Sequence, residues 1–316
     1  MISKDDLPIL DDLDSLLRIL CKTTGQDAQT IALKLLNEHL DVGSNVRSAM
    51  VARKLAFYQW TEELNEFYDS TDAFLFETIV WNRSALKKAM RTWISESIAR
   101  RFEGPIRILC FGDGLGLDSL YFAMKGHHVD FYEVSERSKK FATELFSVTD
   151  VKVQMIADLG DLKVAYYDVI LLLDVLEHVH LPELCVAMLA KSLRPHGYLY
   201  THSPFWLLTP SVTTHLAENQ KYSGDLGRLF TAHQLRPSNA RLLWNPIELQ
   251  KCKHWTVFRR PLTASLRIWL GGYLLWWGRN WNAPHIAAVK YLFSSKHSRW
   301  RELENFIARE KPNEPS

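Results

Sequence analysis

Residues 106–134 read IRILCFGDGLGLDSLYFAMKGHHVDFYEV. A short apolar run, 106–111, leads directly into a glycine turn, and a second apolar run, 129–132, ends on the acid Glu133. Between them, apolar residues recur at helical spacing, so the pattern predicts a strand, a helix over 117–124 and a second strand. This succession is typical of the opening βαβ unit of a doubly wound, mostly parallel α/β sheet.

Three glycines alternate in the turn, at positions 112, 114 and 116. Glycine adopts positive φ freely and allows a ligand to approach the backbone closely. Glu133 is placed to accept hydrogen bonds from a ribose diol at the end of the second strand. The dinucleotide fingerprint would have its third glycine at Leu117, and no Gly-Lys-Ser/Thr follows the turn. The pattern therefore predicts a nucleoside site that is neither a dinucleotide site nor a P-loop.

Three further strand signals follow, and two of them lead to an acid. Alternating apolar residues over 151–155 precede Asp158. A nearly continuous apolar run, 167–173, indicates a strand buried on both faces and ends in DVLEHV. A Pro-x-Gly turn and a fifth strand follow at 193–204. Ligands of open α/β sheets bind at the carboxyl ends of the strands. The side chains and turn expected to meet there are Gly112, Glu133, Asp158, Asp174 and His202.

The alternating glycines, Glu133 and DVLEHV together resemble the class I S-adenosylmethionine-dependent methyltransferases of the small-molecule type, over residues 105–260. The resemblance implies a Rossmann-like sheet of seven mostly parallel strands and S-adenosylmethionine as the cofactor. We assign the sixth and seventh strands to 241–244 and 255–258, the last inserted antiparallel. The cofactor-binding residues that the resemblance implies are Phe111, Gly112, Asp113, Gly114, Gly116, Glu133, Val134, Asp158, Leu159, Asp174 and Val175.

One position departs from the family pattern. The residue two before the first glycine is commonly an acid that helps to hold the methionine amine of the cofactor, but here it is Cys110. An acid, Asp113, lies inside the loop instead. Either Asp113 or another group takes over the amine, or the cofactor binds weakly.

Methyl transfer is an in-line displacement at a sulfonium carbon, so the protein mainly aligns the acceptor and removes its proton. Histidine titrates near neutrality without assistance. The candidate bases are His178 first, then His202 and His215; a structural role for each, or catalysis by positioning alone, are the alternatives. No spacing of metal ligands is apparent, so we predict no metal.

Residues 1–103 show helical periodicity, including a long helix over 72–102. We expect a helical accessory domain that packs on the cofactor-binding domain, 104–260, and covers the cofactor mouth as a lid or forms a homodimer surface. Its aromatic residues either line the substrate cavity or belong to the core. They are Tyr58, Trp60, Tyr68, Phe74, Phe76 and Trp81.

Residues 204–237 lose regular periodicity and are predicted to form a wall of the active site. The tail, 261–316, is predicted to be a helical extension. Residues 251–301 contain ten Lys or Arg, no Asp or Glu, and six of the eleven Trp. Such a segment either packs its aromatic side chains on the fold or makes peripheral membrane contact through 262–281. Its apolar part, 268–278, is too short to span a bilayer.

The formal net charge is only +2, which argues against a nucleic-acid partner. Four scattered cysteines form no zinc or disulfide pattern, and the acidic N-terminus does not read as a secretory signal, so we predict a cytoplasmic protein. The predicted activity is methyl transfer from S-adenosylmethionine to oxygen or nitrogen of a small, hydrophobic or aromatic biosynthetic molecule. The alternatives are a membrane-docking lipid or isoprenoid-quinone methyltransferase and a catalytically silent binding subunit.

Overall fold

The computed structural model describes residues 7–223, 227–241, 246–252, 263–271 and 298–309. Within these ranges one sheet has the strand order β3-β2-β1-β4-β5-β7-β6. Its strands are β1 (Arg107–Phe111), β2 (His128–Tyr132), β3 (Val153–Met155), β4 (Tyr167–Leu173), β5 (Leu193–His202), β6 (Leu235–Ala240) and β7 (Ile247–Lys251). The first five strands pair in parallel, and β7 is antiparallel to both of its neighbours. The predicted doubly wound, seven-stranded sheet is confirmed.

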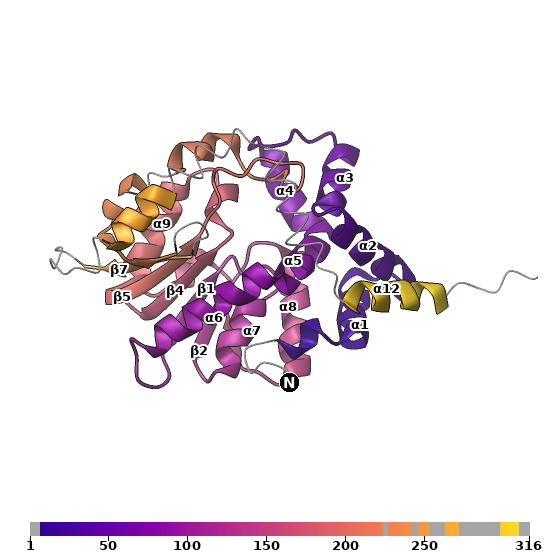
Figure 1. Cartoon of the computed structure of the whole chain (residues 1–316), viewed down its shortest axis with the longest axis horizontal. Helices are drawn as coiled ribbons and strands as arrows, with labels where there is room; N and C mark the ends of the chain where they lie inside the picture. The colour runs from indigo at the N-terminus through magenta and orange to yellow at the C-terminus, as the bar shows by residue number, and fades with distance from the viewer. Residues whose placement is uncertain (1–6, 224–226, 242–245, 253–262, 272–297, 310–316) are drawn as a thin grey trace, which may run out of the picture.

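Helices cover both faces of the sheet because its central strands are apolar on both sides (Figure 1). Alternate residues of β1 enter different cores: Ile108 and Cys110 pack with the helices of one face, and Leu109 packs with those of the other. The first face is covered by α6 (Ala85–Ala99), α7 (Leu117–Met124) and α8 (Glu136–Thr149), and the second by α9 (Pro182–Ser192). The result is a three-layer α/β/α arrangement.

The chain begins with helices that pack beside the sheet (Figure 1). They are η1 (Pro8–Leu10), α1 (Leu13–Thr24), α2 (Ala28–Leu40), α3 (Ser44–Ala52), α4 (Glu62–Ser70) and α5 (Ala73–Arg83). One face of α1 is apolar and buried, with Leu16, Leu17 and Leu20 at most 4% exposed. A late helix, α12 (Ser298–Arg309), packs against α2 and adds Leu303 and Ile307 to the same core.

The predicted single helix over 72–102 is wrong, because the chain turns at Ser84. Its backbone is extended, with φ −66° and ψ 145°, and its hydroxyl accepts a hydrogen bond from the Lys87 N–H at 3.1 Å. A serine in this conformation is a typical helix N-cap. The turn therefore separates α5 from α6.

The predicted sixth strand, 241–244, is also misplaced. The structure has β6 at Leu235–Ala240, at the sheet edge, where half-exposed polar residues and Pro237 obscure the apolar pattern. The predicted seventh strand, 255–258, lies outside the described residues. In the tail, 263–271 and α12 are helical, as expected; the rest of the basic, Trp-rich segment is not described.

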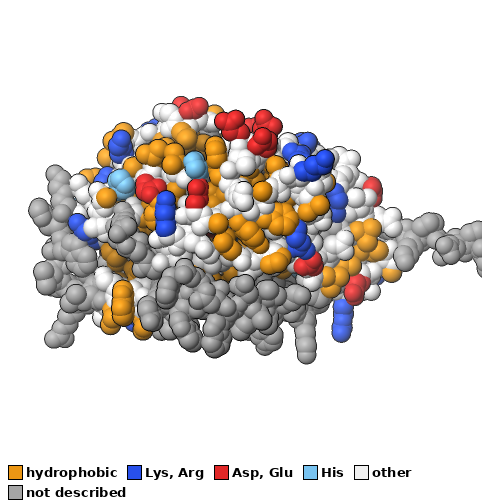
Figure 2. Space-filling view, turned by 90° about the horizontal axis from the view of Figure 1, so that it is seen from above, with side chains coloured by type: hydrophobic (Ala, Val, Ile, Leu, Met, Phe, Trp, Pro, Cys, Tyr) orange, Lys and Arg blue, Asp and Glu red, His pale blue; other side chains and the backbone are white. Residues whose placement is uncertain are grey.

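Four short helical turns complete the described chain: η2 (Leu159–Asp161), η3 (Leu176–His178), η4 (Ala217–Tyr222) and η5 (Gly227–Thr231). Within the described ranges, every helix is too short or too polar to cross a bilayer. Figure 2 looks onto one face of the molecule, where hydrophobic side chains lie beside acidic and histidine side chains and the visible Lys and Arg side chains are scattered. The described Lys and Arg side chains visible on that face therefore form no continuous band.

Candidate functional site

A cavity of about 250 Å³ lies where the glycine turn, the ends of β2, β4 and β5, helices α5 and α6, and the segment 204–216 meet. Eight of the predicted site residues line it. They are Gly112, Asp113, Gly114, Glu133, Asp174, His178, His202 and His215. The structure thus brings the glycine turn and the candidate bases around one space.

The glycine turn has no room for side chains at two of its three glycines. Gly112 has φ +67°, and a Cβ there would lie 2.7 Å from the side chain of Val175. A Cβ on Gly116 would lie 2.6 Å from the Phe146 ring of α8. Gly114, by contrast, has no atom closer than 3.5 Å to a built Cβ, and it lines the cavity. Two glycines are therefore needed for packing, and the middle one leaves the backbone open to a ligand.

Glu133 points toward the glycine turn. One carboxylate oxygen accepts a hydrogen bond from the Gly114 N–H at 2.8 Å, and the other accepts from the N–H groups of Val134 and Ser135 at 2.8 and 3.0 Å. Burial raises the pKa of Glu133, and these N–H groups oppose that rise. The carboxylate is held rigidly at the cavity wall, as the ribose role requires.

A buried charge network lies behind the turn. Lys87 contacts the carboxylates of Asp118 at 3.0 Å and Asp174 at 3.4 Å, and the Arg91 Nε donates to Asp118 at 2.6 Å. Burial opposes ionisation of Asp118, but Lys87 and Arg91 hold its pKa below the usual value. Two cations of α6 therefore hold the carboxylates of Asp118 and Asp174 in place at the base of the cavity.

At the position that departs from the family pattern, Cys110 is a buried thiol, and Asp113 is held by the helix that follows it. Burial, followed by the nearby Asp113 carboxylate, raises the pKa of the Cys110 thiol well above its usual value. Asp113 accepts hydrogen bonds from the N–H groups of Asp118 and Ser119 at 3.1 and 2.7 Å, so it caps the start of α7. Burial and Asp118 raise the pKa of Asp113 to about 7. Asp113 lines the cavity, but its carboxylate is already engaged by the helix.

Asp174 and His202 form a hydrogen-bonded pair across the ends of β4 and β5. Asp174, at φ +60°, contacts His202 Nδ1 and accepts from the Trp81 indole N–H at 2.8 Å. Burial opposes ionisation of Asp174, but His202 and Lys87 hold its pKa well below the usual value. The carboxylate binds His202 Nδ1, so the other ring nitrogen, Nε2, is not used in this pair. The His202 side chain lines the cavity.

The wall of the cavity that faces the glycine turn is formed by aromatic side chains and a loop; we call it the acceptor wall. Tyr68, Phe74 and Trp81 line it from the N-terminal helices, and Trp206 lines it from the segment 204–216. That segment is tied to the helices by hydrogen bonds from the Tyr58 N–H to the Thr213 carbonyl and from the Ala217 N–H to the Tyr58 carbonyl, both 2.9 Å. Of the six aromatic candidates, Phe76 is core instead, and Tyr58 and Trp60 lie outside the cavity lining.

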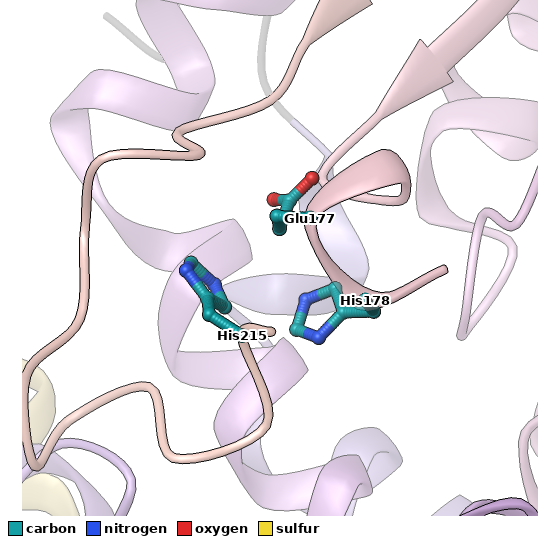
Figure 3. A group of neighbouring side chains, drawn as sticks. All are labelled: Glu177, His178 and His215. Atoms are coloured by element: carbon teal, nitrogen blue, oxygen red, sulfur yellow. The ribbon is translucent and has the colours of Figure 1, made fainter. Parts of the chain in front are cut away.

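Glu177, His178 and His215 gather at this wall (Figure 3). Glu177 is 1% exposed, and burial, followed by Asp174, raises its pKa well above the usual value. Burial lowers the pKa of His178 to about 4 and that of His215 well below its usual value. Both imidazoles are therefore neutral at neutral pH. Sequence spacing predicted no metal, yet the fold brings three potential ligands together.

The remaining predicted residues lie around the cavity rather than in its lining. Val134 and Leu159 are exposed, at 61% and 40%, and the Asp158 carboxylate accepts a hydrogen bond from the Gly160 N–H at 2.7 Å. Phe111 stacks on Tyr132 with ring centroids 4.8 Å apart, and Val175 packs against Gly112. The cofactor-binding roles of Val134, Asp158 and Leu159 stay predictions.

Sequence reasoning missed Lys87 and Asp118, and it named Trp81 as an aromatic residue of the cavity or core but not as a hydrogen-bond donor to Asp174. A signal was present in the sequence: Asp118 interrupts an otherwise apolar helix start, and Lys87 and Arg91 are four residues apart on one helix face. A charge on a helix that must be buried implies a buried partner. Which residue is the partner depends on the packing of α6 against α7, which the sequence pattern does not specify.

These residues fit S-adenosylmethionine. The open backbone at Gly114 and the fixed Glu133 carboxylate lie side by side in one cavity, and no side chain of the described residues occupies the place where a Cβ of Gly114 would lie. A ribose diol can share the outer lone pairs of Glu133, and a methionine chain can pass along the turn.

Residues 83–245, just over half of the chain, match the family model described as "Methyltransferase domain". No curated protein matches the chain by sequence. Among solved structures, the Burkholderia thailandensis 1,6-didemethyltoxoflavin-N1-methyltransferase with bound 1,6-didemethyltoxoflavin and S-adenosylhomocysteine is 19% identical, over 60% of this chain and 88% of that one, with a TM-score of 0.47. The [4+2]-cyclase SpnF is 15% identical over 80% and 93%, with a TM-score of 0.42.

A structure associated with thioacetal formation in echinomycin biosynthesis is 18% identical, with a TM-score of 0.31. The alignment covers 35% of this chain and 46% of that one, so the chain spans under half the length of that relative. Likenesses at this level carry no argument about substrate. The family match, the strand order and the cofactor cavity agree, and the chain belongs to the class I S-adenosylmethionine-dependent methyltransferases.

Proposed function

We propose that the enzyme transfers the methyl group of S-adenosylmethionine to an oxygen or nitrogen of a small, hydrophobic or aromatic molecule. The observation that carries the proposal is that the glycine turn and Glu133 share one cavity with an aromatic wall that includes Tyr68, Phe74 and Trp206. The cofactor supplies an electrophilic methyl on a positively charged sulfur. An acceptor held flat against this wall would have its nucleophile near that methyl, and alignment of this kind supplies much of the rate.

Among the three candidate histidines, His202 is the best placed to act as the base. Asp174 contacts its Nδ1, which fixes the ring orientation and the tautomer with a lone pair on Nε2. Trp81 and Lys87 hold Asp174 in turn. Bound S-adenosylmethionine would supply the methyl group and keep the electrons of the C–S bond on sulfur, and His202 Nε2 would take the proton of the acceptor oxygen or nitrogen.

The helical region, 1–103, is proposed to cover the acceptor. Residues of α5 and α6 already line the cavity, and the segment 204–216 is hydrogen-bonded to the same region. This arrangement supports a lid that excludes water from the transfer. The basic tail supplies no argument for a membrane-docking alternative, because most of 262–281 lies outside the described residues.

The proposal is tested by measuring S-adenosylhomocysteine formation with a panel of hydroxylated and aminated aromatic compounds. For an accepted substrate, His202→Gln should lower kcat about 10²- to 10⁴-fold, because a general base is lost. Its S-adenosylhomocysteine affinity should stay within about twofold. The matched control is His128→Gln, an exposed histidine at the start of β2. A kcat within threefold of wild type for His202→Gln would exclude His202 as the base, and turnover of none of the panel would exclude the acceptor class.

A further inference from the structure

We propose that Glu177, His178 and His215 form a binding site for one divalent first-row transition-metal ion of the Zn²⁺ or Fe²⁺ type, at the acceptor wall of the cavity. Metal binding by these three residues stands independently of the proposed function. Its chemical role, given below, rests on that function.

Two segments far apart in the sequence bring the ligands together (Figure 3). Glu177 and His178 lie on the η3 turn after β4, and His215 lies on the loop before η4. One ligand atom from each lies within 4.8 Å of the other two. Ligands at about 2.1 Å from a tetrahedral ion are about 3.4 Å apart, so side-chain shifts of about 1 Å would close the site.

The two imidazoles are oriented as metal-bound histidines usually are. His215 Nδ1 donates to the Leu207 carbonyl at 2.8 Å, and His178 Nδ1 lies 3.2 Å from the Thr214 carbonyl, with the Tyr68 hydroxyl 2.9 Å from the same nitrogen. A carbonyl oxygen only accepts, so the His215 bond to Leu207 requires the proton on Nδ1. A His178 bond to Thr214 requires the same tautomer, in which the Tyr68 oxygen also accepts from Nδ1. Each Nε2 then has its lone pair available. An Nδ1–H bound to a backbone carbonyl is the common outer-shell arrangement of zinc-ligating histidine.

Glu177 lacks the partner that a buried carboxylate needs. It is 1% exposed, and neither of its oxygens makes a hydrogen bond of ordinary geometry among the described residues; the nearby Ser203 hydroxyl opposes the rise in its pKa only in part. Its backbone is held firmly, because the Leu216 N–H donates to the Glu177 carbonyl at 2.9 Å. An unpaired buried carboxyl is costly, and a cation bound between it and the imidazoles would remove that cost.

The donor set selects the type of ion. Two imidazoles and one carboxylate are typical of catalytic zinc sites and of non-heme iron sites, which keep open positions for water or substrate. Mg²⁺ prefers oxygen ligands and octahedral geometry, so this set disfavours it. The open positions face a cavity that also holds the aromatic wall. They fit adjacent oxygens, as in a dihydroxylated aromatic ring, and a metal there would lower the pKa of the hydroxyl to be methylated.

The test is a Zn²⁺ titration of the chelator-treated, full-length protein by calorimetry, with metal content measured after dialysis. We expect one Zn²⁺ per chain with a Kd of about 1 μM or tighter, and an increase in Tm on binding. Mg²⁺ in the same experiment should bind at least about 100-fold more weakly. Absence of Zn²⁺ binding at 100 μM, or equal binding of Mg²⁺, would overturn the proposal.

Two variants test whether these residues are the ligands of the ion. His215→Ala and Glu177→Gln should each weaken Zn²⁺ binding at least about 100-fold, since loss of an outer-shell partner alone typically costs 10- to 100-fold. His180→Ala is the matched control: this exposed histidine is two residues away from His178 and pairs with Glu218 instead. Two variants are used because either one alone could fail to fold. Unchanged binding in both folded variants would place the ion elsewhere and refute the assignment.

S-adenosylhomocysteine affinity and methyl transfer are measured on the same samples. In the His215→Ala and Glu177→Gln variants, loss of Zn²⁺ binding with unchanged S-adenosylhomocysteine affinity supports the metal site. Failure to bind Zn²⁺ while transfer continues refutes the metal site alone, whereas Zn²⁺ binding without turnover of any acceptor counts against the proposed function alone.

Discussion

Buried carboxyl groups have different surroundings in the two halves of the cavity. The cofactor half is the side of the glycine turn and Glu133, and the acceptor half is the side of Glu177, His178 and His215. In the cofactor half, Glu133 accepts from three backbone N–H groups and Asp118 is paired with Lys87 and Arg91. In the acceptor half, Glu177 makes no hydrogen bond of ordinary geometry among the described residues, and only the nearby Ser203 hydroxyl opposes the rise in its pKa. The carboxyl groups of the cofactor half are thus paired before a ligand binds, as in an electrostatically preorganised site. We propose that a bound ion and acceptor complete the other half.

The largest expected effect tests the completeness of the cofactor half. Lys87→Met removes the cation shared by Asp118 and Asp174, and breaking a buried pair costs about 3–5 kcal/mol of unfolding free energy. Urea denaturation monitored by tryptophan fluorescence measures it. The control, Lys22→Met, breaks an ion pair with Glu144 in which Lys22 is 66% exposed, and should cost under about 1 kcal/mol. Equal losses for the two variants would contradict this account.

A smaller effect is expected at the ribose position. Glu133→Gln keeps the shape but removes the charge that receives the diol, so S-adenosylhomocysteine should bind about 10- to 100-fold more weakly, corresponding to about 1.5–3 kcal/mol. Calorimetric titration gives the affinity. Glu136→Gln, on the exposed first turn of α8, should bind normally. Full affinity in Glu133→Gln would remove the ribose assignment.

The smallest effect concerns pH. The pKa of Asp113 is raised from 3.8 to about 7, so between these values the folded state binds more protons than the unfolded state. Stability should therefore fall as pH rises through this window, by about 1–2 kcal/mol once sharing of charge with Asp118 is allowed for. Asp113→Asn should remove that fall, while its one side-chain oxygen keeps one of the two cap hydrogen bonds to the start of α7. Unfolding free energies at pH 5 and pH 8 provide the test, and a parallel decline in wild type and variant would count against it.

Features that depend on neighbouring residues were predictable from the sequence. The apolar run of β4 and the acid that follows β2 are both visible in the local sequence. Because parallel strands end at the same edge of a sheet, residues that follow them are expected to lie close together there. Gly112 and Glu133 are therefore found from spacing alone. The helix start at Ser135 is a local feature of the same kind, since a serine N-cap whose side chain accepts from the Ser138 N–H depends only on neighbouring residues.

Features that depend on distant packing were not predictable. Lys87 meets Asp118 because α6 lies beside α7, and His215 meets His178 because an irregular segment is tied to the N-terminal helices through Tyr58. No periodic pattern in the sequence predicts either contact. The edge strand β6 was misplaced for a related reason, since a half-exposed strand lacks the apolar alternation on which the prediction relied.

The placement of α12 has a consequence for how the chain matures. Leu303 and Ile307 complete the hydrophobic cluster formed by α1 and α2, roughly 280 residues earlier in the chain. On the ribosome, α1 and α2 emerge first but must wait for residues 298–309 before their exposed apolar surface is fully covered. Until then those helices are a natural substrate for chaperones, and a nonsense mutation just before Ser298 should yield an aggregation-prone protein even though all residues that line the cavity are present.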